Sequence, residues 1–354
     1  MATAVAAWET AHRFRLDRPF VLESGYALEG VEVAYRTWGT LAPAGDNAVL
    51  VCHALTGSAD LDRWWGGTLG PGRAFDPERD FVICSNVLGS CYGTTGPASP
   101  RPDGAGRWGP DFPVVTVRDM VRLQAELLDH LGVRRLRLVA GGSLGGMQAL
   151  EWVAGFPGRA GAAVVIAAPA RQSAWAIALS HAQRAAIEAD PRFRDGRYPV
   201  DDPPRDGLAV ARSIAMCSYR SWESLEGRFG RDTAPGGGFQ VESYLRHHGQ
   251  KLAARFDANS YLTLTRAMDT HDVGRGRGGV EAALAAIAAP VLVVAIDSDL
   301  LFPAEEQWRL VEGLPDARLA WLASPHGHDA FLIETGEIDR LIRGFRDDVS
   351  ADPA

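Results

Sequence analysis

Apolar positions along the chain fall into short continuous runs that alternate with segments of helical spacing. Continuous runs of this length are typical of strands buried on both faces of a parallel sheet, whereas strict alternation indicates a half-buried strand. Continuous runs predict strands at residues 48–55, 80–88, 134–142 and 160–170, and an alternating run predicts one at 31–39. Helical spacing predicts helices at 117–132 and 144–157. The order of these elements predicts an α/β fold, with a mostly parallel sheet and helices on both faces.

A different pattern occupies residues 171–285, where helical segments are separated by turn-rich stretches such as RDGRYPVDDPPRDG. Asn259 lies inside the last long helical segment, and we expect a bend there. The region therefore predicts a helical insertion that interrupts an α/β core. The core would be formed by residues 1–170 and 286–354.

The strand and helix pattern returns after the insertion. It predicts a strand at 289–299, a helix at 304–314, and a strand that starts at residue 317 and leads into a loop as far as residue 332. Residues 347–354, DDVSADPA, predict a frayed tail.

The composition is that of an ordinary globular protein, with 354 residues of which 46% are hydrophobic and 23% charged. The net charge of −8 provides no basic field, so we expect neither nucleic acid nor an anionic membrane as a partner. No apolar run reaches the roughly 18 residues of a membrane span, and the first residues lack the pattern of a secretory signal. The four cysteines form no CxxC pair, which suits a reducing compartment. These features predict a cytoplasmic location.

Residues 141–146, GGSLGG, match the pattern G-x-S-x-G between a predicted strand and a predicted helix. That context is typical of a nucleophile elbow. A serine on so tight a turn adopts unfavourable backbone angles, and flanking glycines avoid clashes with its neighbours. The following helix directs free N–H groups and its positive dipole end at the site. A glycine-rich corner can also be a plain packing turn, but this context predicts that Ser143 is a nucleophile.

A nucleophilic serine needs a base, and the base needs an acid that orients it. In a fold with such an elbow, the aspartate and then the histidine follow late strands. One predicted strand ends in Asp297 and Asp299, and the next leads into His326 and His328. All four reach the edge of the sheet where Ser143 lies, which is where open α/β sheets bind ligands. Their positions alone do not separate the two aspartates or the two histidines.

An oxyanion hole would complete such a site with two backbone N–H groups. One is expected from Leu144, directly after the serine. The run AVLVCHALTG ends at the same edge of the sheet, and Leu55 in it is the candidate for the second. His53 in this run is expected to form structural hydrogen bonds and not to act as a second base.

Several longer segments are more specific than G-x-S-x-G. They read HALTG, NVLGSCYGTTGPAS, GGSLGGMQALEW, RFDANSYLTLTRAMDTHD, SDLLFP and GHDAFL, and they span positions 53 to 332. In these segments the chain resembles the homoserine O-acyltransferases of the α/β-hydrolase superfamily, and among them the homoserine O-acetyltransferases. The resemblance implies an α/β-hydrolase fold, with the insertion at 171–285 as a helical lid, and a homodimer.

The resemblance also implies roles for particular residues. The aspartate of SDLLFP is Asp299 and the histidine of GHDAFL is His328, which resolves both pairs of alternatives. Two further family residues correspond to Asp329 and Arg212, an anion for the ammonium and a guanidinium for the carboxylate of an amino acid. Tyr219 is a further candidate for the same pocket.

The reaction implied by the resemblance is a double displacement. Ser143, assisted by His328 and Asp299, would take an acetyl group from acetyl-CoA and pass it to the hydroxyl of L-homoserine, a step of methionine biosynthesis. Acetyl-CoA is then a co-substrate, and we expect no permanently bound cofactor or metal. The alternatives are a homoserine O-succinyltransferase, a serine O-acyltransferase, a carboxylesterase that uses water, and a non-catalytic binding protein, which the complete triad disfavours.

Overall fold

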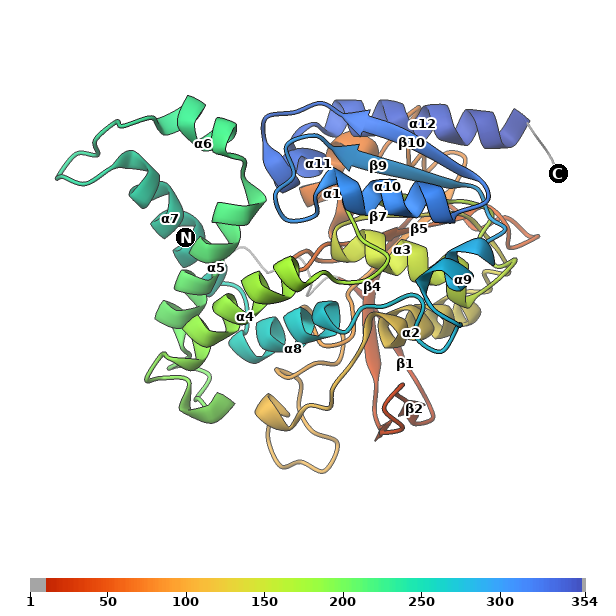
Figure 1. Cartoon of the computed structure of the whole chain (residues 1–354). Helices are drawn as coiled ribbons and strands as arrows, with labels where there is room; N and C mark the ends of the chain where they lie inside the picture. Colours follow the sequence, from red (N-terminus) through yellow and green to blue (C-terminus); the bar gives the residue numbers. More distant parts are fainter. Residues whose placement is uncertain (1–10, 352–354) are drawn as a thin grey trace.

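A mostly parallel eight-stranded sheet forms the centre of the molecule, in a computed structural model that describes residues 11–351 (Figure 1). The strand order is β1-β4-β6-β5-β7-β8-β9-β10, in which β4 pairs antiparallel with β1 and with β6, and the other neighbours are parallel. The strands are β1 (His12–Arg15), β4 (Glu32–Trp38), β5 (Ala48–Cys52), β6 (Phe81–Ser85), β7 (Leu136–Gly142), β8 (Ala163–Ile166), β9 (Val291–Ile296) and β10 (Ala317–Leu322). A small separate sheet pairs β2 (Phe20–Val21) with β3 (Ala27–Leu28). The predicted α/β architecture is confirmed.

Helices cover both faces of this sheet. One face carries α2 (Val117–His130), α3 (Leu144–Gly155), α9 (Val280–Ala285) and α10 (Ala304–Gly313). The other carries α1 (Leu61–Trp64), α11 (Ala330–Ile333) and α12 (Thr335–Ala351). Within residues 11–351, no helix is both long and apolar enough to cross a membrane.

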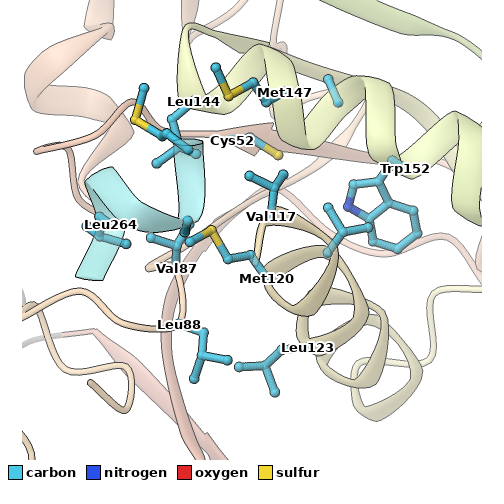
Figure 2. Close-up of a cluster of buried hydrophobic side chains, with 14 of the residues drawn as sticks. Cys52, Val87, Leu88, Val117, Met120, Leu123, Leu144, Met147, Trp152 and Leu264 are labelled. Carbon is cyan, nitrogen blue, oxygen red and sulfur yellow. The ribbon is translucent and has the colours of Figure 1, made fainter. Parts of the chain in front are cut away.

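Alternate strand residues feed two separate hydrophobic cores because side chains of a strand point to opposite faces. In β5, Leu50 belongs to the core under α2 and α3, whereas Val49 and Val51 belong to the core under α12. Figure 2 shows part of the first core, where Met147 and Trp152 of α3 lie near residues of α2. Burial on both faces explains why the sequence of β5 reads as a continuous apolar run.

A group of helices lies between β8 and β9 in the chain, in the region predicted to be an insertion. They are α4 (Ala174–Glu188), α5 (Arg205–Tyr219), α6 (Trp222–Phe229), α7 (Gln240–Ala253) and α8 (Ala258–Asp269). Figure 1 shows these helices together on one side of the sheet, with α6 and α7 farthest from it. The sixth helix of this region, α9, packs instead against α10 on the sheet.

Two local predictions were wrong. The bend expected at Asn259 falls earlier, between α7 and α8, and Asp257 begins the new helix by accepting a hydrogen bond from the Ser260 N–H at 2.8 Å. Asn259 itself lies inside α8. The predicted frayed tail is helical as far as Ala351, because α12 continues past its packed residues Ile338 and Ile342; residues 352–354 lie outside the described chain.

Candidate active site

Ser143 stands at the corner between β7 and α3 in a backbone conformation that residues with a side chain rarely adopt. Its φ is 58° and its ψ is −125°. Such a conformation costs on the order of 1–3 kcal/mol, and it persists only where the surrounding structure enforces it. The predicted strand, turn and helix are therefore present, and the turn is strained at the serine as a nucleophile elbow requires.

The surroundings enforce this turn through close backbone contacts that only glycine permits. A Cβ atom on Gly145 would lie 2.2 Å from the carbonyl oxygen of Cys52 at the end of β5. A Cβ atom on Gly142 would lie 2.6 Å from the ring of Phe331. The first turn of α3 is thus pressed against the end of β5, and the last residue of β7 against the segment that follows His328.

His328 and Asp299 form a buried pair at the same edge of the sheet. The Nδ1 atom of His328 lies 2.7 Å from Oδ2 of Asp299, and both side chains are almost fully buried. The other carboxylate oxygen of Asp299 accepts hydrogen bonds from the N–H groups of Leu301 and Phe302, at 2.8 and 3.0 Å. Because these bonds fix the carboxylate as an acceptor, Nδ1 of His328 carries the proton and Nε2 is left for the reaction.

The competing candidates have other partners. Asp297 is exposed and accepts a hydrogen bond from the Ser324 N–H at 3.0 Å. His326 lies 3.2 Å from the Ser224 hydroxyl through its Nδ1 atom. The geometry therefore separates the alternatives that the sequence left open, in favour of Asp299 and His328.

Two phenylalanine rings flank the His328 imidazole beside the elbow. The rings of Phe302 and Phe331 lie 5.3 and 5.6 Å from it, and Phe331 is the ring that meets Gly142. Among the described residues, no hydrogen bond joins the Ser143 hydroxyl to His328. Such bonds often tighten only when substrate is bound, so Ser143 and His328 remain the candidate nucleophile and base.

The charge of Asp299 changes the titration of His328. Burial lowers the pKa of this histidine, but the Asp299 carboxylate, helped by Asp329, raises it by more. The pKa of the imidazole therefore lies above its ordinary value of 6.5. This direction is expected for a base whose protonated form is stabilised by a buried carboxylate.

The backbone amides of Leu55 and Leu144 are the candidates for an oxyanion hole. Both residues are buried at the carboxyl end of the sheet, and neither N–H donates to any acceptor in residues 11–351. His53 supports the first of them: its Nδ1 lies 2.8 Å from the Ala54 carbonyl oxygen, and its Nε2 accepts from the Val87 N–H at 3.2 Å. Burial lowers the pKa of His53 to about 4, so this ring is neutral and structural.

Two charged side chains and a tyrosine ring lie near His328. The ring of Tyr219 lies 5.7 Å from that of His328, and the Arg212 guanidinium carbon lies 5.0 Å from the centre of the same tyrosine ring. Asp329 is mostly buried, and burial raises the pKa of its carboxyl group against the opposing charges of Arg212 and Arg220. The structure therefore brings Arg212 and Asp329, the two residues that the resemblance assigned to an amino acid, together with the further candidate Tyr219.

Arg220 was missed by the sequence analysis. Its Nε atom lies 3.5 Å from a carboxylate oxygen of Asp329 and donates to the Tyr244 hydroxyl at 3.2 Å. Arg212, by contrast, forms no ion pair with any residue of the described chain. The only sequence signal for Arg220 was its place directly after Tyr219. Arg220 thus contacts one carboxylate oxygen of Asp329, and the charge of Arg212 is available to a bound anion.

No group of three or more histidine, cysteine, aspartate or glutamate side chains within residues 11–351 has the arrangement of a metal site. The arrangement as a whole suits nucleophilic acyl transfer. It provides a strained serine, a base oriented by a carboxylate, and two free amides.

Comparisons with known proteins agree with the fold. The family model of the alpha/beta hydrolase fold matches residues 47–335. A homoserine O-acetyltransferase of Trichormus variabilis is 56% identical over 343 residues, which cover 97% of this chain and 95% of that protein.

Among solved structures, a homoserine O-acetyltransferase from Bacillus anthracis is similar with a TM-score of 0.88 and 26% identity, covering 95% of this chain and 97% of that one. Esterase E22 is similar with a TM-score of 0.87 and 28% identity, covering 95% and 99%. The shape of the fold is thus shared by proteins of both kinds, and the 56% identity to the acetyltransferase of Trichormus variabilis exceeds the identity to either structure.

Proposed function

Because the chain belongs to the homoserine O-acetyltransferase family of α/β-hydrolase-fold enzymes, we propose that it transfers an acetyl group from acetyl-CoA to L-homoserine by way of an acyl-serine. One observation carries the choice of acceptor. Arg212 is without an ion-pair partner among the described residues, and it shares the Tyr219 ring with His328. A free cation and a buried carboxylate beside the base suit an acceptor that is itself an amino acid.

The first half of the proposed reaction forms the acyl-enzyme. His328 takes the proton of the Ser143 hydroxyl through Nε2, and the serine oxygen attacks the thioester carbonyl carbon. The charge that develops on the carbonyl oxygen is stabilised by the amides of Leu55 and Leu144. The carbon–sulfur bond then breaks, and the thiol of CoA leaves with the proton that His328 held.

The second half transfers the acetyl group to the acceptor. Arg212 binds the carboxylate of homoserine and Asp329 attracts its ammonium group, so that the hydroxyl is directed at His328. The histidine takes the hydroxyl proton, the oxygen attacks the ester carbonyl, and the proton returns to Ser143 as its bond to the acetyl group breaks. Asp299 stabilises the imidazolium that forms in each half.

A carboxylesterase is the second candidate, because esterase E22 shares the fold at a TM-score of 0.87. The same triad would then pass the acyl group to water. The family resemblance further supports a cytoplasmic homodimer of methionine biosynthesis without a permanent cofactor, and we include these features in the proposal. Homoserine O-succinyltransferase and serine O-acyltransferase activities are the alternatives within the family.

Release of free thiol from acyl-CoA tests the proposed function. Acetyl-CoA and succinyl-CoA are each supplied with L-homoserine, with L-serine or without an acceptor. We expect fast thiol release only with acetyl-CoA and homoserine together, and O-acetylhomoserine as the product. Full-rate release without an acceptor would establish the esterase instead, and fast release only with succinyl-CoA or only with serine would establish one of the other family activities.

Replacing Arg212 with methionine is expected to lower kcat/KM for homoserine about 100-fold, because the substrate carboxylate would be buried without its partner. Acetylation of the enzyme by acetyl-CoA should be unchanged, since homoserine takes no part in that half. Arg205→Met on the same helix is the matched control, because Arg205 is exposed. A loss of the acetylation rate in Arg212→Met, or an equal loss in the control, would contradict the assigned role.

Activity is expected to rise with pH through the titration of His328, because the base must be neutral to accept a proton. Since the pKa of His328 is raised, the acid limb of kcat/KM is expected above pH 6.5.

The free energy of unfolding should change with pH in the opposite direction. The pairing of protonated His328 with Asp299 stabilises the fold at low pH, and this contribution is lost as pH rises through the raised pKa. Rate profiles and urea unfolding at the same pH values measure both, and an acid limb at or below pH 6.5 would contradict the assignment.

A further inference from the structure

Beneath the elbow lies a chain of hydrogen bonds between buried polar side chains. The indole Nε1 of Trp152 donates to Oε1 of Gln124 at 2.8 Å, and Nε2 of Gln124 donates to Oε1 of Gln148 at 2.8 Å. Nε2 of Gln148 then donates to two backbone carbonyl oxygens, of Leu144 at 3.1 Å and of His53 at 3.3 Å. Gln148 and Trp152 belong to the segment MQALEW, which has no role in the proposed mechanism.

Trp152 fixes the direction of this series of hydrogen bonds. An indole N–H can only donate, so the Gln124 amide must turn its oxygen toward Trp152 and its NH₂ group toward Gln148. Gln148 must in turn present its oxygen to Gln124 and its NH₂ group to the two carbonyls. The side chains of Trp152, Gln124 and Gln148 are at most 3% exposed, so bulk water offers no substitute partner.

The two carbonyls belong to the two backbone segments that carry the candidate oxyanion amides. One is the carbonyl of Leu144 itself, in the first turn of α3, and the other is that of His53, two residues before Leu55. A single side-chain amide therefore connects the loop after β5 to the start of the elbow helix. The close approach of Gly145 to Cys52 brings the same two segments into direct contact.

We propose that Gln148 is a positioning residue that sets the distance between the Leu55 and Leu144 amides, held in its orientation by Gln124 and Trp152. This inference rests on the proposed function for the identity of those amides as an oxyanion hole. Hydrogen-bond donors that point at a developing charge stabilise it because they are already in place. A small increase in the distance between the two amides therefore reduces the stabilisation of the transition state and leaves substrate binding almost unchanged. Since both halves of the reaction develop charge on the same oxygen, both should slow together.

Gln148→Met keeps the length of the side chain and removes both donors, and it tests this inference. We expect kcat for enzyme acetylation and for transfer to homoserine each to fall about 10-fold, with both KM values unchanged. Gln307→Met is the matched control, because Gln307 is also fully buried but lies on α10. It should lower the melting temperature similarly and leave kcat unchanged. A Gln148→Met enzyme with normal kcat, or with only one half slowed, would overturn the proposal.

Gln148→Glu provides a second readout that does not depend on how much stability is lost. A carboxylate would face two carbonyl oxygens, whereas a protonated carboxyl can still donate to one of them. The ratio of variant to wild-type kcat should therefore rise as pH falls, and a ratio independent of pH would count against the role. Hydrolysis of p-nitrophenyl acetate in the same variants separates the two proposals, since it requires the oxyanion hole without requiring homoserine or CoA. If wild type fails to acetylate homoserine but the Gln148 effects appear with this ester, only the proposed acceptor is wrong.

Discussion

Replacing Ser143 with alanine is expected to lower kcat for acetyl transfer by about 10⁴- to 10⁶-fold, the largest effect of any single change in this chain. The hydroxyl is the only group at the strained corner that can form the acyl-enzyme, and no neighbouring nucleophile shares its backbone position. The rate should be measured as thiol release from acetyl-CoA in the presence of homoserine. Mass spectrometry of the protein after exposure to acetyl-CoA alone should show one added acetyl group in wild type and none in the variant.

The variant should remain folded because alanine retains the Cβ atom, and the glycines that meet Cys52 and Phe331 are unchanged. An unaltered melting temperature would show this. Adding His328→Ala to Ser143→Ala should cost little more, since the two residues act as one unit. Retention of most activity by Ser143→Ala would show that the triad assignment is wrong.

Asp299→Asn is expected to lower kcat about 10⁴-fold while leaving the packing of the site intact. The amide of asparagine can turn its NH₂ group toward Nδ1 of His328, which then accepts a hydrogen bond and leaves the proton on Nε2. In that tautomer the histidine can no longer take a proton from Ser143. The backbone N–H groups of Leu301 and Phe302 favour this orientation, because they require the remaining oxygen of the side chain as their acceptor.

Asp297→Asn is the matched control for this change, since Asp297 lies two residues away and is exposed. It should retain nearly full activity. The Asp299 variant should also lose the carboxylate charge that raises the pKa of His328, so the acid limb of its residual activity should move to lower pH. Equal losses in the two variants would mean that the structure of the loop, and not the bond from Asp299 to His328, determines the rate.

The strands and helices of the core were predictable because their apolar residues follow the spacing of buried strands and of helices. A run such as that of β5 is apolar throughout because both faces of the strand are buried. The bend at Asn259 was misplaced because its cause was the carboxylate of Asp257, which caps the next helix from outside it. The helical spacing of Ile338, Ile342 and Phe345, which pack on the sheet, signals the C-terminal helix, and only the polar composition of residues 347–354 suggested a frayed end.

The candidate site was predictable in its outline and not in its contacts. Order along the chain was enough to find Ser143 and the two loops that carry the acid and the base. Choosing Asp299 over Asp297 required either the resemblance or the geometry, because adjacent loop residues differ only in the direction of their side chains. Arg220 and Gln148 were not foreseen, since Arg220 meets Asp329 only in the folded chain, and the segment that contains Gln148 indicated the family and no role for this side chain.

The crowding around the elbow also bears on how such enzymes can diverge. At Gly142 and Gly145 any larger residue would strike Phe331 or the backbone of Cys52, so almost every mutation there is expected to be lost by selection. Arg212 and Tyr219 lie on α5, outside this corner. A lineage that changes its acyl acceptor would therefore accumulate its substitutions in the insertion, while the residues around Ser143 stay the same.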